Sequence, residues 1–210
     1  MAGINFSEIL VPFVVLIISL TVHEAAHAWT ANRLGDPTAR LLGRLSLNPA
    51  VHVDLIGTVL FPLIAIITGV PLIGWAKPVP VDPRNLRKPR TDFAIVALAG
   101  PVSNLLMAGA GALLFAAVSG GNFEVLRGNI LATGLFYFVM LNVLLAVFNM
   151  IPIPPLDGGN VLMGVLPASM AVLVQRIRPY GFVLIYLLLI SGVLGAIVRP
   201  LEHFLMDSLL

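Results

Sequence analysis

Long apolar runs separated by short polar connections dominate the chain. Five segments carry little or no charge, namely residues 9–32, 55–76, 93–123, 128–156 and 179–198. Each is long enough to cross the hydrocarbon core of a bilayer, which takes about 20 helical residues. A shorter apolar stretch, 160–174, fits a half-helix or an interfacial helix. The pattern predicts an all-α, polytopic membrane bundle of about four to six membrane segments, forming one domain over residues 1–210.

The second segment has two interpretations. Basic residues lie on both sides of it, so a simple crossing would place basic connections on both faces of the membrane, against the positive-inside rule. A re-entrant path, which enters and leaves on one face, would keep both connections cytoplasmic. Glycines and prolines would permit such a broken path: Gly57, Pro62, Gly69, Pro71 and Gly74. An ordinary kinked transmembrane helix is the alternative.

On the re-entrant interpretation, the remaining connections alternate between the two faces. The N-terminus, the 122–127 connection and the C-terminus are then outside, and Arg176 and Arg178 are inside. We therefore expect a multi-pass protein of the cell membrane whose candidate catalytic residues lie toward the cytoplasmic side.

Composition agrees with a membrane location and narrows the possible chemistry. Hydrophobic residues make up 59% of the chain, and charged residues make up 10%, against roughly 25% in soluble domains. The net charge of +2 comes from residues in the connections, so nucleic acid is not an indicated partner. The sequence contains no cysteine, so a metal ion would have to be bound by His, Asp or Glu.

Ionisable side chains interrupt the end of the first apolar run. His23 and His27 are four residues apart, about 400° of helical rotation, which places both rings on one face. This spacing suits two ligands of one zinc ion, and Glu24 is placed to act as a general base on a water molecule. Because ionisable groups within a membrane span are costly, they indicate a functional site. The alternative is that water satisfies them in the headgroup region.

A third ligand is expected in the stretch "NMIPIPPLDGG", residues 149–159. Asp157 follows a long uncharged stretch and lies among prolines and glycines that should break the helix. A broken helix at membrane depth is tolerated where it lines a cavity, and there a ligand and a water molecule could meet. Taken alone, the pattern is more often that of a turn, in which an aspartate before two glycines is common.

Together these motifs resemble the site-2 protease family of intramembrane zinc metalloproteases, peptidase family M50. "HEAAH", "AGPVSN" (99–104) and "NMIPIPPLDGG" occur in family order, and residues 33–58 and 74–89 are similar to the compact prokaryotic members. The resemblance covers most of residues 18–165. The chain leaves no room for the PDZ or CBS modules of other members.

The resemblance implies roles for individual residues. One zinc ion would be bound by His23, His27 and Asp157, and Glu24 would activate its water. Asn149, ahead of the LDG motif, would position substrate or stabilise the oxyanion. Asn104, in the AGP-x-x-N position, would lie near the active site in a supporting or substrate-contacting role.

Other sequence features leave alternatives open. His52 could support the site at its mouth, or it could be an ordinary interfacial histidine. The "KPVPVDP" segment, 77–83, could be an extended edge for an unwound substrate, or a proline-stiffened loop.

For the whole chain we expect cleavage of transmembrane substrates within or near their spans, in contact with lipid. The competing hypothesis is a membrane metal-ion transporter or metal-binding protein, because intramembrane His and Asp also mark ion pathways.

Overall fold

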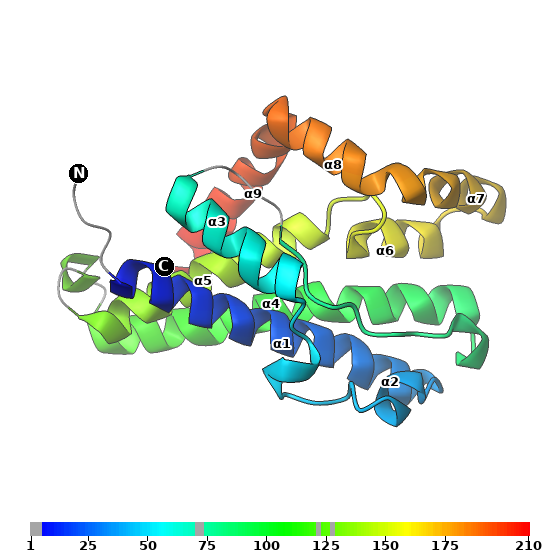
Figure 1. The fold of residues 1–210 in the computed structure, drawn as a ribbon, viewed down its shortest axis with the longest axis horizontal. Coiled ribbons are helices and arrows are strands. Elements are labelled where there is room, and N and C mark those ends of the chain that lie inside the picture. The colour runs from blue at the N-terminus through cyan, green and yellow to red at the C-terminus, as the bar shows by residue number, and fades with distance from the viewer. Residues whose placement is uncertain (1–5, 70–73, 121–122, 127–128) are drawn as a thin grey trace.

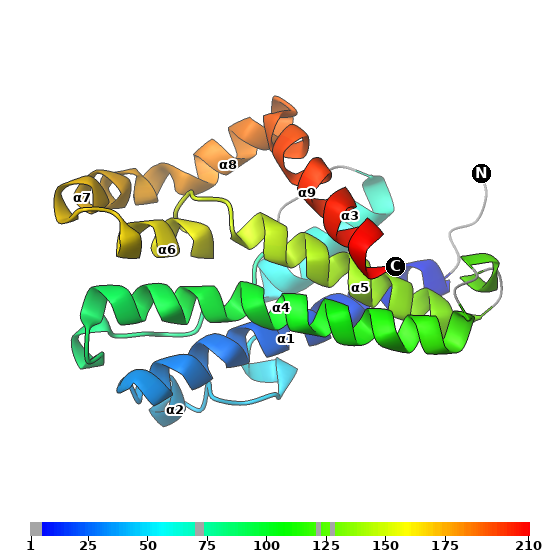
Figure 2. The ribbon, with the colours of Figure 1, turned by 180° about the vertical axis from the view of Figure 1, so that it is seen from behind.

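The computed structural model of the protein is a bundle of helices (Figures 1 and 2), and it describes residues 6–69, 74–120, 123–126 and 129–210. No strand occurs among these residues. Pro71, Asn122 and Arg127, which entered the sequence predictions, lie outside the described residues. The predicted all-α, polytopic fold is confirmed. Among the described residues, four helical stretches are long and apolar enough to span a membrane: Ile9–Leu34, Pro89–Ser119, Ile130–Asn149 and Ala168–Ile190.

Three long helices form the centre of the bundle. Helix α1 (Phe6–Leu34) and helix α5 (Ile130–Asn149) run in the same direction, and α4 (Pro89–Ser119) runs against them (Figure 1). A cluster of small and branched apolar side chains fills the space beside α4 and α5: Ala108, Ala112, Val139, Val143, Val147, Ile151, Ile185, Leu194 and Val198. Small residues let the backbones of membrane helices approach closely, which is how such bundles gain packing contacts.

Local sequence signals set the ends of these helices. Pro89 occupies the first turn of α4, where a missing N–H costs nothing, and Gly120 ends that helix with φ 58°. Asn129 caps α5, its side chain accepting from the amides of Leu131 and Ala132. Within α4, Pro101 supplies no amide to the preceding turn, where the helix comes close to α1.

The connection between α1 and α4 carries short helical pieces. Helix α2 (Thr38–Leu41) and a 3-10 turn (Pro49–Val51) precede a π-helical segment (Leu55–Leu60) that continues into α3 (Phe61–Thr68). An extended stretch then leads to a 3-10 turn (Pro83–Asn85) before α4.

The two ends of the segment 55–76 lie together, which is the arrangement that the re-entrant interpretation expects. Its helical part ends at Gly69, whose φ of 70° suits a glycine. The returning chain bonds to the point of departure: the Trp75 amide donates to the Gly57 carbonyl at 3.1 Å, and the Lys77 amide donates to the His52 carbonyl at 2.9 Å. Both ends of the segment therefore lie at one level.

The chain after α5 breaks as predicted. Residues 150–156 are irregular, and α6 (Asp157–Val165) begins at the aspartate. A Cβ at Gly158 would collide with the backbone of Met150, and one at Gly159 would collide with that of Ile153 and Pro154. The two glycines are thus what allows the proline-rich loop to cross the start of α6.

The last predicted span does not coincide with the helices that the structure shows. The expected span 179–198 contains a break, because Gly192 has φ 77° and separates α8 (Gly181–Ile190) from α9 (Val193–Leu209). The span-length stretch instead joins α7 (Ala168–Ile177), a 3-10 turn (Arg178–Tyr180) and α8. Apolar content alone did not locate this break. The stretch 160–174 forms parts of α6 and α7, separated by Leu166 and Pro167.

Candidate metal centre

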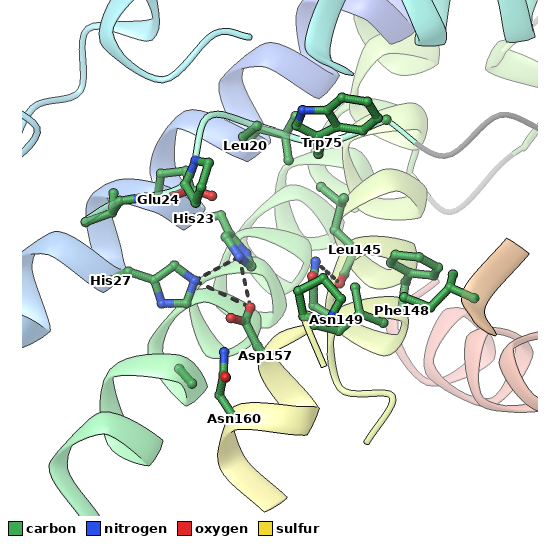
Figure 3. Close-up of a pocket in the computed structure, with 18 of the residues that line it drawn as sticks. Leu20, His23, Glu24, His27, Trp75, Leu145, Phe148, Asn149, Asp157 and Asn160 are labelled. Atoms are coloured by element: carbon green, nitrogen blue, oxygen red, sulfur yellow. Dashed lines mark hydrogen bonds and ion pairs between the residues drawn. The ribbon is translucent and has the colours of Figure 1, made fainter. Parts of the chain in front are cut away.

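Two histidines and an aspartate from opposite ends of the chain converge at one point (Figure 3). The Nε2 atoms of His23 and His27, one turn apart on α1, lie 3.0 Å from each other. The Asp157 Oδ2 atom, at the start of α6, lies 3.1 Å from the first and 3.4 Å from the second. All three ligand atoms lie within 4.8 Å of one another, so they could hold a single ion.

The hydrogen bonds behind the imidazoles suit metal ligands. His27 Nδ1 lies 2.7 Å from the Val96 carbonyl oxygen, which can only accept, so Nδ1 carries the hydrogen and Nε2 is left with a lone pair. His23 Nδ1 faces the Asn104 Oδ1 atom at 2.5 Å in the same way. Ligating histidines in proteins are oriented by such contacts.

The three converging ligand atoms are stable at this distance only with a cation between them. Asp157 Oδ2 is buried without a hydrogen-bond partner, beside two nitrogen lone pairs. Three acceptor atoms turned toward one point repel one another unless a positive charge lies between them. Two imidazoles and one carboxylate are also a common ligand set of catalytic zinc, which leaves a fourth position for water. The residues therefore fit a zinc ion.

Glycine 100 lets α4 approach this cluster. A Cβ at that position would collide with the Nε2 atoms of both His23 and His27. The AGP sequence thus places a side-chain-free surface against the two rings. Sequence reasoning did not single out Gly100, although it quoted the motif.

Glu24 lies beside the histidines and is also buried. Its Oε2 atom accepts from the Val79 amide at 2.9 Å, which ties the carboxylate to the extended segment before α4. The Arg44 guanidinium holds the same segment through the Lys77 carbonyl at 2.6 Å. The contact between Glu24 and Val79 was not predicted, because nothing in the sequence sets the register of this segment against α1.

A cavity of about 870 Å³ opens beside the cluster. Asn149 lines it, with one amide hydrogen donated to the Leu145 carbonyl at 3.0 Å. Asn160, one turn after Asp157, also lines it, and its Oδ1 atom is buried without a hydrogen-bond partner. Most of the other lining residues are apolar or aromatic: Leu20, Phe61, Trp75, Phe93, Leu145, Phe148, Phe182 and Ile185.

Two further predicted residues lie outside the cavity lining. Asn104 is fully buried behind His23, so its position fits support of a ligand and not contact with substrate. His52 is buried at the base of the re-entrant segment, where its Nε2 atom bonds the Ser46 carbonyl at 2.8 Å. It does not line the cavity, and both the supporting role at the mouth of the site and the interfacial position stay predictions.

A polar hub fixes the chain at the end of α1. Asp36 is 0% exposed and accepts from the side chains of Thr38 and Asn85 and from the Asp82 amide. Burial by itself would raise the pKa of Asp36, but these hydrogen bonds outweigh it and hold the pKa below the ordinary value. The hub anchors the segment whose Val79 reaches Glu24.

Comparison with known proteins shows relatives over most of this chain. The model of peptidase family M50 matches residues 124–192. A Bacillus subtilis protein named "Putative zinc metalloprotease YwhC" is 37% identical over 207 residues, which cover 96% of this chain and 90% of that protein. A Mycolicibacterium smegmatis protein named "Putative zinc metalloprotease Rip2" is 28% identical over 192 residues, 91% of this chain and 71% of the relative.

A Mycobacterium tuberculosis protein of that name is 31% identical over 143 residues, 68% of this chain and 52% of its own length. No solved structure matches the chain. These likenesses place the protein in the class of membrane metalloproteases. The chain belongs to peptidase family M50, which confirms the resemblance seen in its motifs.

Proposed function

We propose that this protein is an intramembrane zinc metalloprotease that hydrolyses peptide bonds within or near the transmembrane segments of membrane-anchored proteins. The observation that carries the proposal is the convergence of His23, His27 and Asp157 beside a buried Glu24, at the wall of a largely apolar cavity. In this proposal, His23, His27 and Asp157 bind one zinc ion. A metal centre at a cavity of this kind gives a substrate room next to a general base.

The chemistry can be divided among the residues. Zinc, when bound, would supply a Lewis acid that activates a water molecule and polarises the scissile carbonyl. Glu24 accepts the proton of the attacking water and passes it to the leaving amine, so that one water is consumed for each peptide bond broken. Asn149 has a second amide hydrogen besides the one bonded to Leu145, and it donates this hydrogen to the substrate's carbonyl oxygen.

The surroundings of the site suit a membrane substrate. A peptide bond in a transmembrane helix is shielded because its carbonyl is bonded internally and water is scarce. Apolar side chains along the cavity would receive the lipid-facing residues of such a segment, and polar side chains are grouped around the metal centre. The substrate must unwind locally, so helix-weakening residues are expected near its scissile bond.

The orientation follows from the charges. Basic residues gather at the end of the bundle where α1 ends and α4 begins, and His23 and His27 lie in the half of α1 nearer that end. By the positive-inside rule this end faces the cytoplasm, so the site opens toward the cytoplasmic side of the cell membrane. The basic residues concerned are Arg33, Arg40, Arg44, Lys77, Arg84, Arg87, Lys88 and Arg90.

The test replaces Glu24 by glutamine. Glu24→Gln keeps the shape of the side chain and removes the base, so we expect zinc content to be unchanged and cleavage to fall by about 10²- to 10⁴-fold. Zinc is measured by elemental analysis of purified protein. Cleavage is measured in membranes of cells that express either form, as accumulation of single-span proteins trimmed on the outer side.

A matched carboxylate-to-amide change provides the control. Glu202 lies on α9 and does not line the cavity, so Glu202→Gln should leave zinc and cleavage at wild-type levels. Purified wild-type protein without stoichiometric zinc would overturn the proposal. So would accumulation of the same trimmed proteins in wild-type and Glu24→Gln membranes.

A further inference from the structure

A chain of polar side chains crosses the apolar interior of the bundle behind His23. It contains Ser19 on α1, Asn104 on α4 and Asn142 on α5, all fully buried and none lining the cavity. Substrate therefore does not reach them. Buried amides in a membrane bundle are costly unless they are hydrogen-bonded, so their presence in three adjacent helices requires an explanation.

The hydrogen bonds in this chain have a fixed direction. Asn142 Nδ2 lies 2.8 Å from the Phe138 carbonyl, which can only accept, and 2.9 Å from the Ser19 hydroxyl. The Asn142 amide is thereby oriented, with its Oδ1 atom toward Asn104. Reversing it would set two carbonyl oxygens against each other.

The direction is passed on to Asn104 and then to the histidine. Asn104 Nδ2 donates to Asn142 Oδ1 at 2.7 Å, so Asn104 must turn its own Oδ1 atom toward His23. That oxygen lies 2.5 Å from His23 Nδ1, which must carry the hydrogen. The Nε2 lone pair is then left for the metal centre.

The two histidines are thus oriented by different means. His27 is fixed directly by the Val96 carbonyl of α4. His23 is fixed by two amides in series, which end at the Phe138 carbonyl of α5. Both arrangements end at a backbone carbonyl, an acceptor that cannot exchange roles.

We propose that Asn142 is a positioning residue of the metal centre, which acts through Asn104 to hold His23 with its Nε2 lone pair toward Asp157 and His27. The inference rests on the proposed metal site and adds to it a residue some distance from the cavity. Asn142 touches neither substrate nor metal in this role. Ser19 is an accessory partner, because the Phe138 carbonyl fixes the amide without it.

The test compares leucine and aspartate at each position. Asn104→Leu and Asn142→Leu keep the approximate volume and remove the acceptor. Asn104→Asp and Asn142→Asp, in the neutral form that the apolar surroundings favour, keep an acceptor oxygen toward the next group and an O–H donor toward the group that now accepts from the amide. We expect Asn104→Leu to weaken zinc binding by about 10- to 100-fold, and Asn142→Leu by about 10-fold. The aspartate variants should stay within about threefold of the wild type.

Zinc affinity is measured by competition with a chromophoric chelator, using the full chain purified in detergent. Thermal unfolding of the metal-free protein is recorded for every variant. Ser19→Ala should bind zinc almost as the wild type does. A purely structural role predicts the opposite order, because leucine suits an apolar bundle and a buried carboxyl group does not.

The outcomes separate this inference from the proposed function. The hydrogen-bonded series from Asn142 through Asn104 to His23 is called the relay below. If the wild type binds zinc, and the leucine variants bind it more weakly than the aspartate variants, the relay is supported even if cleavage is never observed. Leucine variants that fold and bind zinc as well as the aspartate variants would overturn the relay and leave the protease proposal intact. If Asn142→Leu does not fold, the comparison of Asn104→Leu with Asn104→Asp tests the relay. Failure of the wild type to bind zinc would overturn both.

Discussion

The helices that carry the proposed metal ligands and the helix that forms the far wall of the cavity differ in how they are packed. In an apolar 18-residue window of each of α1, α4 and α5, 28%, 33% and 33% of residues are buried, against 11% in such a window of the stretch 168–190 that contains α8. The histidines lie on the first group, and α6 brings Asp157 against α4. Helix α8 contributes Phe182, Ile185 and Tyr186 to the cavity.

The proposed metal ligands thus lie on well-packed helices, and the cavity is bounded on its other side by a loosely packed one. Metal ligands must be held in place by packed neighbours, because small displacements reduce affinity and rate. A wall with few contacts can move at low cost, as regions that admit ligands generally do. Helix α8 is therefore the less tightly packed wall of the cavity, whereas α1 and α6 carry the proposed metal ligands and pack against α4. Trp75 of the re-entrant segment and Phe182 of α8, with ring centroids 6.1 Å apart, lie where the two walls meet.

The largest effect is expected inside the packed region. Gly100→Ala would place a methyl group against both Nε2 atoms, so we expect zinc affinity to fall by more than about 100-fold, beyond the cost of losing one hydrogen bond to a ligand. Gly109, on the same helix, has open space at its Cβ position. Gly109→Ala is therefore the control and should bind zinc normally. Equal zinc affinity of the two variants would mean that α4 does not press on the histidines.

A smaller effect is expected where α8 joins the rest. A Cβ at Gly181 would collide with the Pro154 carbonyl, so Gly181→Ala must shift the start of α8 and should destabilise the fold by about 1–3 kcal/mol. Because no ligand lies on α8, zinc content should stay at the wild-type level and cleavage should fall. Gly195→Ala, whose new methyl group would meet only the Arg199 side chain at 3.7 Å, is the matched control. Loss of zinc in Gly181→Ala would show that the two regions are not separable.

The smallest effect on the site is expected at the Asp36 hub. Asp36→Asn loses the charge that accepts from Thr38, Asn85 and the Asp82 amide, so stability at neutral pH should fall by about 1–3 kcal/mol with zinc retained. The folded state lowers the pKa of Asp36, so its contribution is full above the ordinary pKa of 3.8 and is lost as the pH falls through the folded-state value.

Thermal unfolding of the purified protein between neutral and acidic pH measures this effect. The difference between wild type and Asp36→Asn should shrink as the pH falls below 3.8. Asp82→Asn is the comparison, because the Asp82 carboxylate pairs with the exposed Arg84 and should matter little. A difference between wild type and Asp36→Asn that does not change with pH would contradict the role assigned to the carboxylate.

Much of the architecture could be read from the order of residues. Apolar run length predicted the long helices, because a bilayer-spanning helix has a minimum length. The i, i+4 spacing of His23 and His27 predicted a shared face, because helical geometry is local. The prolines and glycines around Asp157 predicted the broken helix, since those residues act on their own backbone. The family motifs favoured Asp157 as a proposed ligand over an ordinary turn residue.

Other features depended on contacts between distant segments. The break at Gly192 moved the last span, and the hydrogen bond from Trp75 to Gly57 brought the two ends of the second segment together. The partner of Glu24, the approach of Gly100 to the histidines and the burial of Asn142 are likewise set by how helices lie against one another. Composition and local spacing fix what a segment can form and which face it presents. Only packing between helices decides which atoms meet, because that choice depends on the fit of side chains far apart in the sequence.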